Sequence, residues 1–268
     1  MNAELSLEGR VAVVTGGGRG LGRAMTHGLA RAGATVIATA ARERDEVERV
    51  AAEAGPNGRV VPIVADVTRE EDCRRVVGTA LDRFGRIDVL VNNAGRGMKY
   101  VSDQFMTEPT RFWETALDVW RMVMDTNVVG PFLMARTAVP PMLAAGWGRI
   151  INVSINAETM RRQGFSPYGP SKAALESATI IWAQDLAGSG VTVNVLLPGG
   201  AALTGMIPAS YPNHLRAKLL DPAIMVPPLL WLAGVRSDGV TGRRFVAMRW
   251  REDSPEEASE ASQAPFFD

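Results

Sequence analysis

Short apolar runs rich in valine and isoleucine recur along the chain, separated by longer stretches with helical spacing. In the first of these stretches Leu21, Met25 and Leu29 recur every four residues, which places them on one face of a helix. Runs that are apolar at nearly every position are typical of strands buried on both faces of a sheet. The alternation predicts an α/β fold with a parallel sheet and helices on both faces. The expected strands are Val11–Thr15, Thr35–Thr39, Arg59–Ala65, Ile87–Val91, Arg149–Ser154, Val191–Leu197 and Phe245–Met248.

The chain shows no linker and no internal repeat, so residues 1–250 are expected to form one domain. From Arg251 to Asp268 the composition changes. This segment is acidic, rich in Ser, Ala and Pro, and has no apolar period before Phe266 and Phe267. Such a composition predicts a mobile tail over residues 251–268.

The charge balance limits the classes of partner. Lysine plus arginine equals aspartate plus glutamate, 29 of each, so the chain has no net attraction for nucleic acid or anionic membranes. No apolar run approaches the roughly 18 residues of a membrane span, and the first ten residues lack the apolar core of a signal peptide. The single cysteine, Cys73, excludes an internal disulfide, and His27 and His214 have no Cys/His cluster beside them. These features predict a cytoplasmic protein without a metal site.

A glycine-rich loop follows the first expected strand and opens the first expected helix. Glycine is needed where the backbone turns tightly or approaches a ligand without a Cβ in the way. The helix that follows offers unpaired N–H groups and the positive end of its dipole. In the first βαβ unit this combination predicts a site for the pyrophosphate of a dinucleotide. The loop reads Thr15-Gly16-Gly17-Gly18-Arg19-Gly20-Leu21-Gly22.

This pattern, T-G-x-x-x-G-x-G, resembles the cofactor loop of the short-chain dehydrogenase/reductase family. The resemblance implies a single Rossmann-type domain with a doubly wound parallel sheet of about seven strands. It also implies a nicotinamide cofactor and hydride transfer to or from a carbonyl or alcohol carbon. It extends from Gly9 to about Met248. Four further motifs follow in the family's order, namely Asp66-Val67, Asn92-Asn93-Ala94-Gly95, Tyr168-x-x-x-Lys172 and Pro198-Gly199.

The resemblance also implies the cofactor contacts. Asp66 is expected to accept from the adenine amino group, to cap the helix expected over Thr68–Phe84, or to do both. Thr204 is the candidate for a threonine near the carboxamide and the pyrophosphate. The full set is Gly16, Gly18, Arg19, Gly20, Leu21, Gly22, Arg42, Asp66, Val67, Asn93, Ala94, Gly95, Tyr168, Lys172, Pro198, Gly199 and Thr204.

The end of the second expected strand bears on the choice of cofactor. In Rossmann sites an acid there binds the 2′-hydroxyl of NAD, whereas a nearby arginine accommodates the 2′-phosphate of NADP. Here Ala40 stands at the acid's expected position, Arg42 follows, and Arg19 faces the same region from the glycine loop. Two guanidiniums bind a dianionic phosphate through charge-assisted hydrogen bonds. The sequence therefore predicts a preference for NADP(H) over NAD(H).

Tyr168 and Lys172 lie four residues apart and project from one face if Tyr168–Ala187 is helical. A neighbouring ammonium favours the phenolate and brings the pKa of a tyrosine nearer the operating pH. In the resembled family the tyrosine is the acid/base and the lysine also holds the cofactor ribose. Asn127 matches an asparagine that supports a water between the lysine and bulk solvent. The resemblance therefore implies that Tyr168, Lys172 and Asn127 are catalytic.

The family's serine is displaced in this chain. In the family the serine lies thirteen positions before the tyrosine. In this chain Ile155 occupies that position, so Ser154 is one position early and Asn156 is one position late. Side chains alternate faces along a strand, so a slip of one residue turns Ser154 away unless the loop 157–167 carries an insertion. Alternatively the Asn156 amide supplies the donor, or there is no direct substitute. We take Ser154 as the first candidate for the catalytic serine.

Two segments, 96–118 and 200–228, are expected to shape a substrate pocket because they are rich in methionine and aromatic residues. The resemblance implies a small carbonyl or alcohol substrate and a homodimer or homotetramer. A second interpretation is a non-catalytic or weakly catalytic dinucleotide-binding regulator or scaffold with the same fold, which the isoleucine at the serine position supports. The expected pocket residues are Met98, Tyr100, Phe105, Met106, Phe112, Trp113, Met206, Ile207, Tyr211 and Met225.

Overall fold

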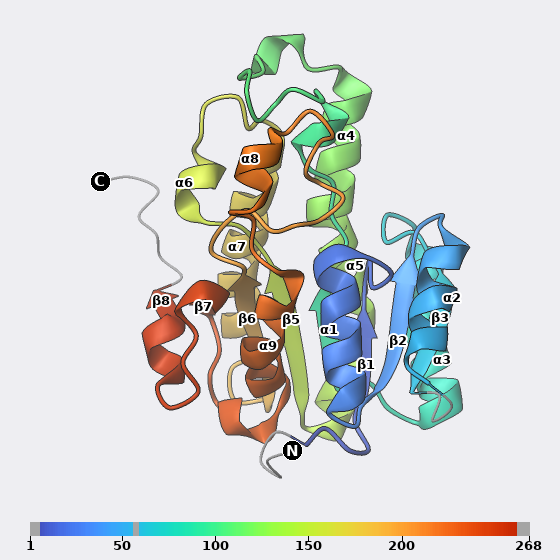
Figure 1. The fold of residues 1–268 in the computed structure, drawn as a ribbon. Coiled ribbons are helices and arrows are strands. Elements are labelled where there is room, and N and C mark those ends of the chain that lie inside the picture. Colours follow the sequence, from blue (N-terminus) through green and yellow to red (C-terminus); the bar gives the residue numbers. More distant parts are fainter. Residues whose placement is uncertain (1–5, 56–58, 262–268) are drawn as a thin grey trace.

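The computed structural model describes residues 6–55 and 59–261. Seven parallel strands form one sheet in the order β3-β2-β1-β4-β5-β6-β7, and an antiparallel strand, β8, extends it (Figure 1). The strand order reverses between β1 and β4, which is the switch point of a doubly wound sheet. The strands are β1 Val11–Val14, β2 Thr35–Ala40, β3 Val60–Val64, β4 Val89–Asn92, β5 Gly148–Val153, β6 Val191–Leu197, β7 Arg243–Val246 and β8 Ser259–Ala261.

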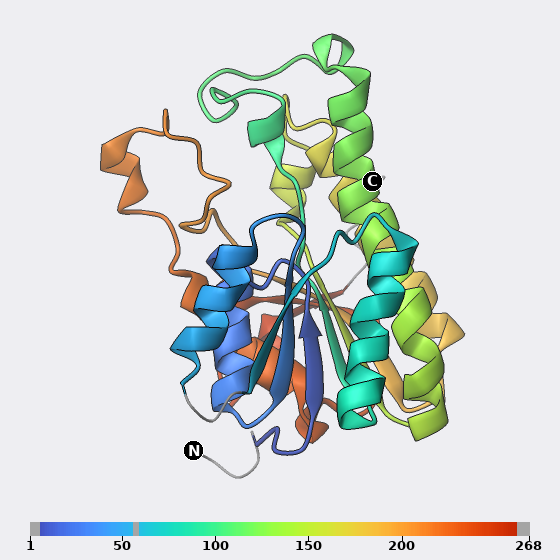
Figure 2. The same ribbon diagram turned by 90° about the vertical axis from the view of Figure 1, so that its right-hand side faces the viewer.

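Helices cover both faces of this sheet (Figure 2). One layer contains α1, α2 and α9, and the other contains α3, α5 and α7. The predicted α/β fold is therefore confirmed. The helices are α1 Gly20–Arg31, α2 Arg44–Glu53, α3 Glu70–Phe84, α4 Leu117–Met124, α5 Gly130–Ala145, α6 Ala157–Met160, α7 Tyr168–Asp185, α8 Asn213–Arg216 and α9 Val226–Ala233.

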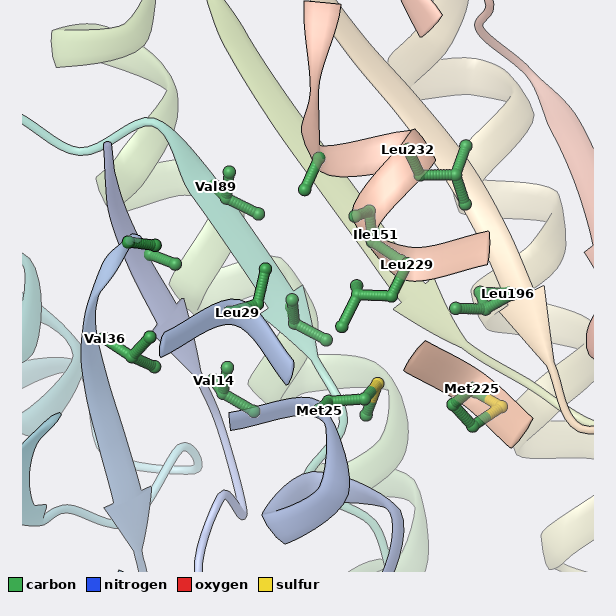
Figure 3. Close-up of a cluster of buried hydrophobic side chains, with 14 of the residues drawn as sticks. Val14, Met25, Leu29, Val36, Val89, Ile151, Leu196, Met225, Leu229 and Leu232 are labelled. Carbon is green, nitrogen blue, oxygen red and sulfur yellow. The ribbon is translucent and has the colours of Figure 1, made fainter. Parts of the chain in front are cut away.

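The central strands are buried at every position, which explains their continuous apolar sequences. Figure 3 shows the core on the α1 side, where Met25 and Leu29 of α1 pack against Val14 and Ile151. Full burial of one such side chain contributes about 1.5–3 kcal/mol to the stability of the fold. Met225, expected in a substrate pocket, is fully buried in this same core, so that assignment was wrong.

Regular structure continues past residue 250, where the sequence predicted a mobile tail. The 3₁₀ helix Pro255–Ala258 buries Ala258 in the main core, and β8 then pairs with β7. The prediction was wrong for residues 255–261, because pairing with an edge strand uses backbone groups and needs no apolar period. Phe266 and Phe267 lie outside the described residues.

One helical stretch, Leu117–Ala145, is long and apolar enough to cross a membrane by length and composition alone. The stretch is not an unbroken apolar run, because Asp118, Arg121, Asp125 and Arg136 interrupt it. In the structure the stretch comprises α4, a π-helical turn at Asp125–Val129 and α5. Its α5 part packs against α3, β4 and β5. A core helix packed on a sheet can have the same length and apolar composition as a membrane-spanning helix.

The segments that follow β4, β5 and β6 gather beyond one end of the sheet (Figures 1 and 2). They contain α4, α6 and α8. In open parallel sheets, ligands bind outside the carboxyl ends of the strands, at the point where the strand order reverses. The fold therefore places the candidate site at this end.

Candidate active site

The glycine loop joins β1 to α1 and adopts a backbone that favours glycine. Gly16 and Gly20 have φ angles of 62° and 52°, in the left-handed region. A Cβ on Gly22 would lie 2.0 Å from the carbonyl oxygen of Gly16, so the first turn of α1 packs directly on the loop. A Cβ on Gly18 would meet Glu46 of α2 at 2.9 Å. These contacts explain why glycine stands at several positions of the loop.

The loop is also fixed to the end of β4. The Asn93 side chain donates from Nδ2 to the carbonyl oxygens of Thr15 and Gly16, at 2.8 and 3.0 Å. The hydroxyl oxygen of Thr15 accepts from the backbone N–H groups of Asn93 and Ala94, both at 3.0 Å. The structure thus brings together two motifs that lie almost eighty residues apart in the sequence.

The start of α1 suits an anionic group. Its first turn contains no acidic residue, and no side chain caps it. The first N–H groups of a helix have no partner within the helix, so they attract a phosphate. Thr204, from the segment after β6, lies against the loop, since a Cβ on Gly20 would be 3.0 Å from its methyl group. The residues present therefore fit the pyrophosphate of a dinucleotide.

Two arginines lie near the end of β2. Arg42 is exposed just after the strand, and Nη1 of Arg19 lies 3.3 Å from Oε1 of Glu46. The Arg19 side chain is 63% exposed, and exposed pairs of this kind contribute only about 0–1 kcal/mol. The Arg19 guanidinium is therefore free to exchange Glu46 for a stronger anion.

Asp66 and Val67 follow β3. Oδ1 of Asp66 accepts from the N–H and the hydroxyl of Thr68, at 3.0 and 2.8 Å. The helix begins at Glu70 rather than Thr68, and its N-terminal residue has no side-chain cap, so the expected capping role of Asp66 was wrong. Val67 packs on the start of α5, because a Cβ on Gly130 would lie 2.7 Å from its methyl group.

Lys172 is buried where three elements converge. Its Nζ donates to the carbonyl oxygen of Val153 at the end of β5, at 2.8 Å. A Cβ on Gly95 would lie 3.7 Å from this Nζ and 3.3 Å from Oδ1 of Asn127. Burial lowers the pKa of Lys172 to about 8, and the carboxylate of Glu176 opposes that change. The lysine therefore titrates near physiological pH.

Asn127 lies in the π-helical turn between α4 and α5, a feature that often marks functional sites. Its Oδ1 accepts from the N–H of Arg96 at 2.8 Å, and its Nδ2 donates to the Arg96 carbonyl and to Oγ of Ser171, both at 2.9 Å. Ser171 in turn donates to the carbonyl oxygen of Tyr168 at 2.7 Å. The side chain of Asn127 thus ties the loop after β4 to α7. The sequence analysis missed Ser171, although it stands between the two motif residues of that helix.

Tyr168 opens α7, and its ring packs on a small apolar cluster with Met98, Phe105 and Phe165. Burial raises the pKa of Tyr168 to about 12. The expected lowering by the lysine ammonium is not present, because Nζ of Lys172 is directed at Val153 instead. Tyr168 is consequently protonated at neutral pH, which is the form that donates a proton.

The Ser154 hydroxyl makes no hydrogen bond to Tyr168 in this structure. Ser154 is only 2% exposed, and its hydroxyl lies beside the carboxylate of Glu176 without completing a hydrogen bond. Burial raises the pKa of Glu176, and the serine only partly opposes that change. The catalytic role of Ser154 therefore stays a prediction. Asn156 and Ile155 are both partly exposed.

Pro198 and Gly199 form the turn after β6. Gly199 has a φ angle of 94°, and a Cβ there would lie 2.7 Å from Val246, so the position favours glycine. The Pro198 carbonyl accepts from the N–H of Met248 at 3.1 Å. This turn directs the segment 200–228 towards the glycine loop, where Thr204 lies.

The two segments expected to shape a pocket contact each other. Nζ of Lys99 donates to the carbonyl oxygen of Gly205 at 3.4 Å, and a Cβ on Gly97 would lie 3.4 Å from Sδ of Met206. Phe112 and Trp113, however, are 69% and 63% exposed and lie on the surface of the first segment. Within residues 6–55 and 59–261, no cluster of three or more His, Cys, Asp or Glu side chains could hold a metal ion.

Comparisons with known proteins show the family to which the chain belongs. The model of the family described as short chain dehydrogenase matches residues 10–214. The 3-oxoacyl-[acyl-carrier-protein] reductase of Thermotoga maritima is 31% identical over 246 residues, which cover 89% of this chain and 96% of that protein.

Two solved structures are similar along nearly their whole length. One is a 3-ketoacyl-(acyl-carrier-protein) reductase from Brucella melitensis complexed with NADH, at 29% identity and a TM-score of 0.77, covering 88% of this chain and 96% of that one. The other is a putative NAD(P) dependent gluconate 5-dehydrogenase from Beutenbergia cavernae with bound NADP, at 33% identity and a TM-score of 0.78, covering 91% and 97%. The chain therefore belongs to the short-chain dehydrogenase family of oxidoreductases.

Proposed function

We propose that this protein transfers a hydride between NADP(H) and a small carbonyl or secondary alcohol substrate, with Tyr168 as the acid/base. The observation that carries the proposal is the placement of Tyr168 and buried Lys172 on α7, at the end of the sheet that also holds the uncapped start of α1. We propose a cytoplasmic homodimer or homotetramer. The exposed Phe132 of α5 and Ile181 of α7 support an assembly through these helices.

The chemistry follows from the protonation states. A bound nicotinamide dinucleotide supplies or accepts the hydride. In the reducing direction the hydroxyl of Tyr168 donates its proton to the substrate oxygen, which becomes the alcohol. We propose that the ammonium of Lys172, which donates to the Val153 carbonyl, holds the ribose of the bound cofactor. In the oxidising direction the phenolate of Tyr168 accepts the proton of the alcohol.

The first experiment is NADPH and NADH consumption over a panel of ketones, ketoacyl thioesters and keto-sugars. We expect turnover of at least one class, with NADPH as the better donor. The ketoacyl thioesters come first because two of the similar proteins are reductases of acyl-carrier-protein substrates. Tight binding of NADPH without turnover of any compound would instead favour the non-catalytic regulator.

The cofactor preference gives a second prediction. Arg42→Ala should weaken NADPH binding about tenfold and leave NADH binding unchanged, because a hydrogen bond to a charged group contributes about 1.5–3 kcal/mol. Fluorescence titration of each cofactor measures both constants. Arg44→Ala is the matched control, since Arg44 is exposed nearby and pairs with Glu48 on its own helix. Equal weakening of both cofactors, or tighter binding of NADH by the wild type, would contradict the NADP(H) assignment.

The displaced serine gives a third prediction. Ser154→Ala should change kcat less than threefold, because its hydroxyl is buried beside Glu176. Asn156→Ala should lower kcat about tenfold or more, since loss of one donor to the reacting oxygen costs at least about 1.4 kcal/mol. Steady-state kinetics with the best substrate compares the two variants. A large loss in Ser154→Ala alone would restore the serine to the catalytic role.

A further inference from the structure

A buried ion pair lies directly behind the catalytic lysine. Nε of Arg244, on β7, donates to both carboxylate oxygens of Glu176, on α7, at 3.1 Å. The two side chains are only 3% and 5% exposed. Withdrawing two charges from water is costly, and an apolar pair of similar size is often as stable. Stability alone therefore does not explain a charged pair at this position.

The pair contacts the elements that carry the catalytic group. Glu176 lies one helical turn after Lys172 on α7, and Nη2 of Arg244 donates to the carbonyl oxygen of Ile155 at 2.6 Å. Nζ of Lys172 holds the carbonyl oxygen of Val153 two residues earlier. Two cations thus fix the backbone on either side of Ser154, and Glu176 faces that serine.

We propose that Glu176 and Arg244 are positioning residues of the active site, in which Glu176 keeps Lys172 charged and Arg244 fixes the strand end to which Lys172 is anchored. The inference rests on the proposed function of Tyr168 and Lys172. Burial raises the pKa of the Glu176 carboxyl, and the charge and hydrogen bonds of Arg244 oppose that change, so Arg244 favours the ionised form that acts on the lysine.

The surroundings of Lys172 support Glu176 as the group that acts on it. On α7 the titratable neighbours are Glu176 and Tyr168, and Arg244 lies behind Glu176 on β7. The other elements present uncharged groups: Ser154 after β5, Gly95 after β4 and Asn127 from the π-helical turn. The guanidinium of Arg96, in the loop after β4, stacks on the ring of Tyr100. Glu176 is thus the carboxylate that opposes the effect of burial on Lys172.

The test is a direct titration of Lys172 by NMR. The chain contains three lysines, Lys99, Lys172 and Lys218, so lysine labelled at Cε and Nζ gives a spectrum that single Lys→Arg variants assign. In the wild type the midpoint of Lys172 is expected near pH 8. In Glu176→Gln it should fall by about one pH unit, because an opposite charge close to an ionised group commonly shifts its pKa by at least that much.

Two further variants make the result decisive. Glu176→Gln leaves Arg244 buried without its carboxylate and can fail to fold, so Glu176→Leu/Arg244→Met removes both charges and should also lower the midpoint. Asp185→Asn removes the same charge from an exposed position of α7 and should leave the midpoint unchanged. A wild-type midpoint in the folded Glu176 variants, or an equal shift in Asp185→Asn, would overturn the inference.

Kinetics separates this inference from the proposed function. If both hold, the high-pH limb of the kcat profile moves to lower pH in Glu176→Gln, together with the Lys172 midpoint. A shifted midpoint in a protein that turns over no substrate supports the role of Glu176 towards the lysine and overturns the proposed activity. Turnover that depends on Tyr168, with an unshifted midpoint, supports the activity and overturns the role of the pair.

Discussion

Tyr168→Phe is expected to lower kcat by about 10²–10⁴-fold, the range that general acid–base catalysis contributes. The change removes the hydroxyl that, in the proposed mechanism, donates its proton to the substrate oxygen. The ring of Tyr168 packs in an apolar cluster with Met98, Phe105 and Phe165, and phenylalanine preserves that packing. Stopped-flow or steady-state NADPH oxidation with the best substrate of the panel measures the loss.

The control for this variant is cofactor binding and thermal stability. Both should stay close to the wild-type values. Among the residues that the structure describes, the Tyr168 hydroxyl makes no hydrogen bond that the variant would lose. Tyr168→Phe with near wild-type kcat would exclude the tyrosine as the proton donor and remove the main support for the proposed mechanism.

Gly22→Ala is expected to have the second largest effect, lowering both stability and cofactor affinity. Its Cβ would lie 2.0 Å from the Gly16 carbonyl oxygen and 2.6 Å from Nδ2 of Asn93, so the backbone of the loop must move. Overpacking of this kind costs about 1–3 kcal/mol. The displaced loop should also lose at least about tenfold in NADPH affinity, measured by fluorescence titration alongside thermal unfolding.

Gly78→Ala is the matched control, since it places the same methyl group in a helix interior where nothing lies within 4 Å. There alanine should stabilise the protein by about 0.5–1 kcal/mol, because glycine loses more conformational freedom on folding. If Gly22→Ala binds NADPH as tightly as Gly78→Ala does, the glycine loop is not the pyrophosphate site.

The fold could be predicted because its sequence signals are local. Each parallel strand was predicted within two residues at either end, since burial on both faces demands a continuous apolar run, as in β5 and β6. Antiparallel β8 was not predicted, because its pairing with β7 depends on backbone groups that the tertiary fold brings together.

The site could be predicted only in part, for a related reason. The motif placed Tyr168 and Lys172 on one helix, but it carried no information about the direction of Nζ, which the Val153 carbonyl determines. The surroundings of Ser154 depend on strand register and on the carboxylate of Glu176, which α7 places beside it. The buried partner of Glu176, Arg244, lies 68 residues further along the chain and has no motif of its own.

The position of β8 has a consequence for association between chains. Its register places residue 260 beside Arg244, so β8 covers the backbone edge of β7. If β8 detached, β7 would present an open edge that could pair with strands of other chains. Opening of β8 would thus expose the strand that carries Arg244, the partner of Glu176.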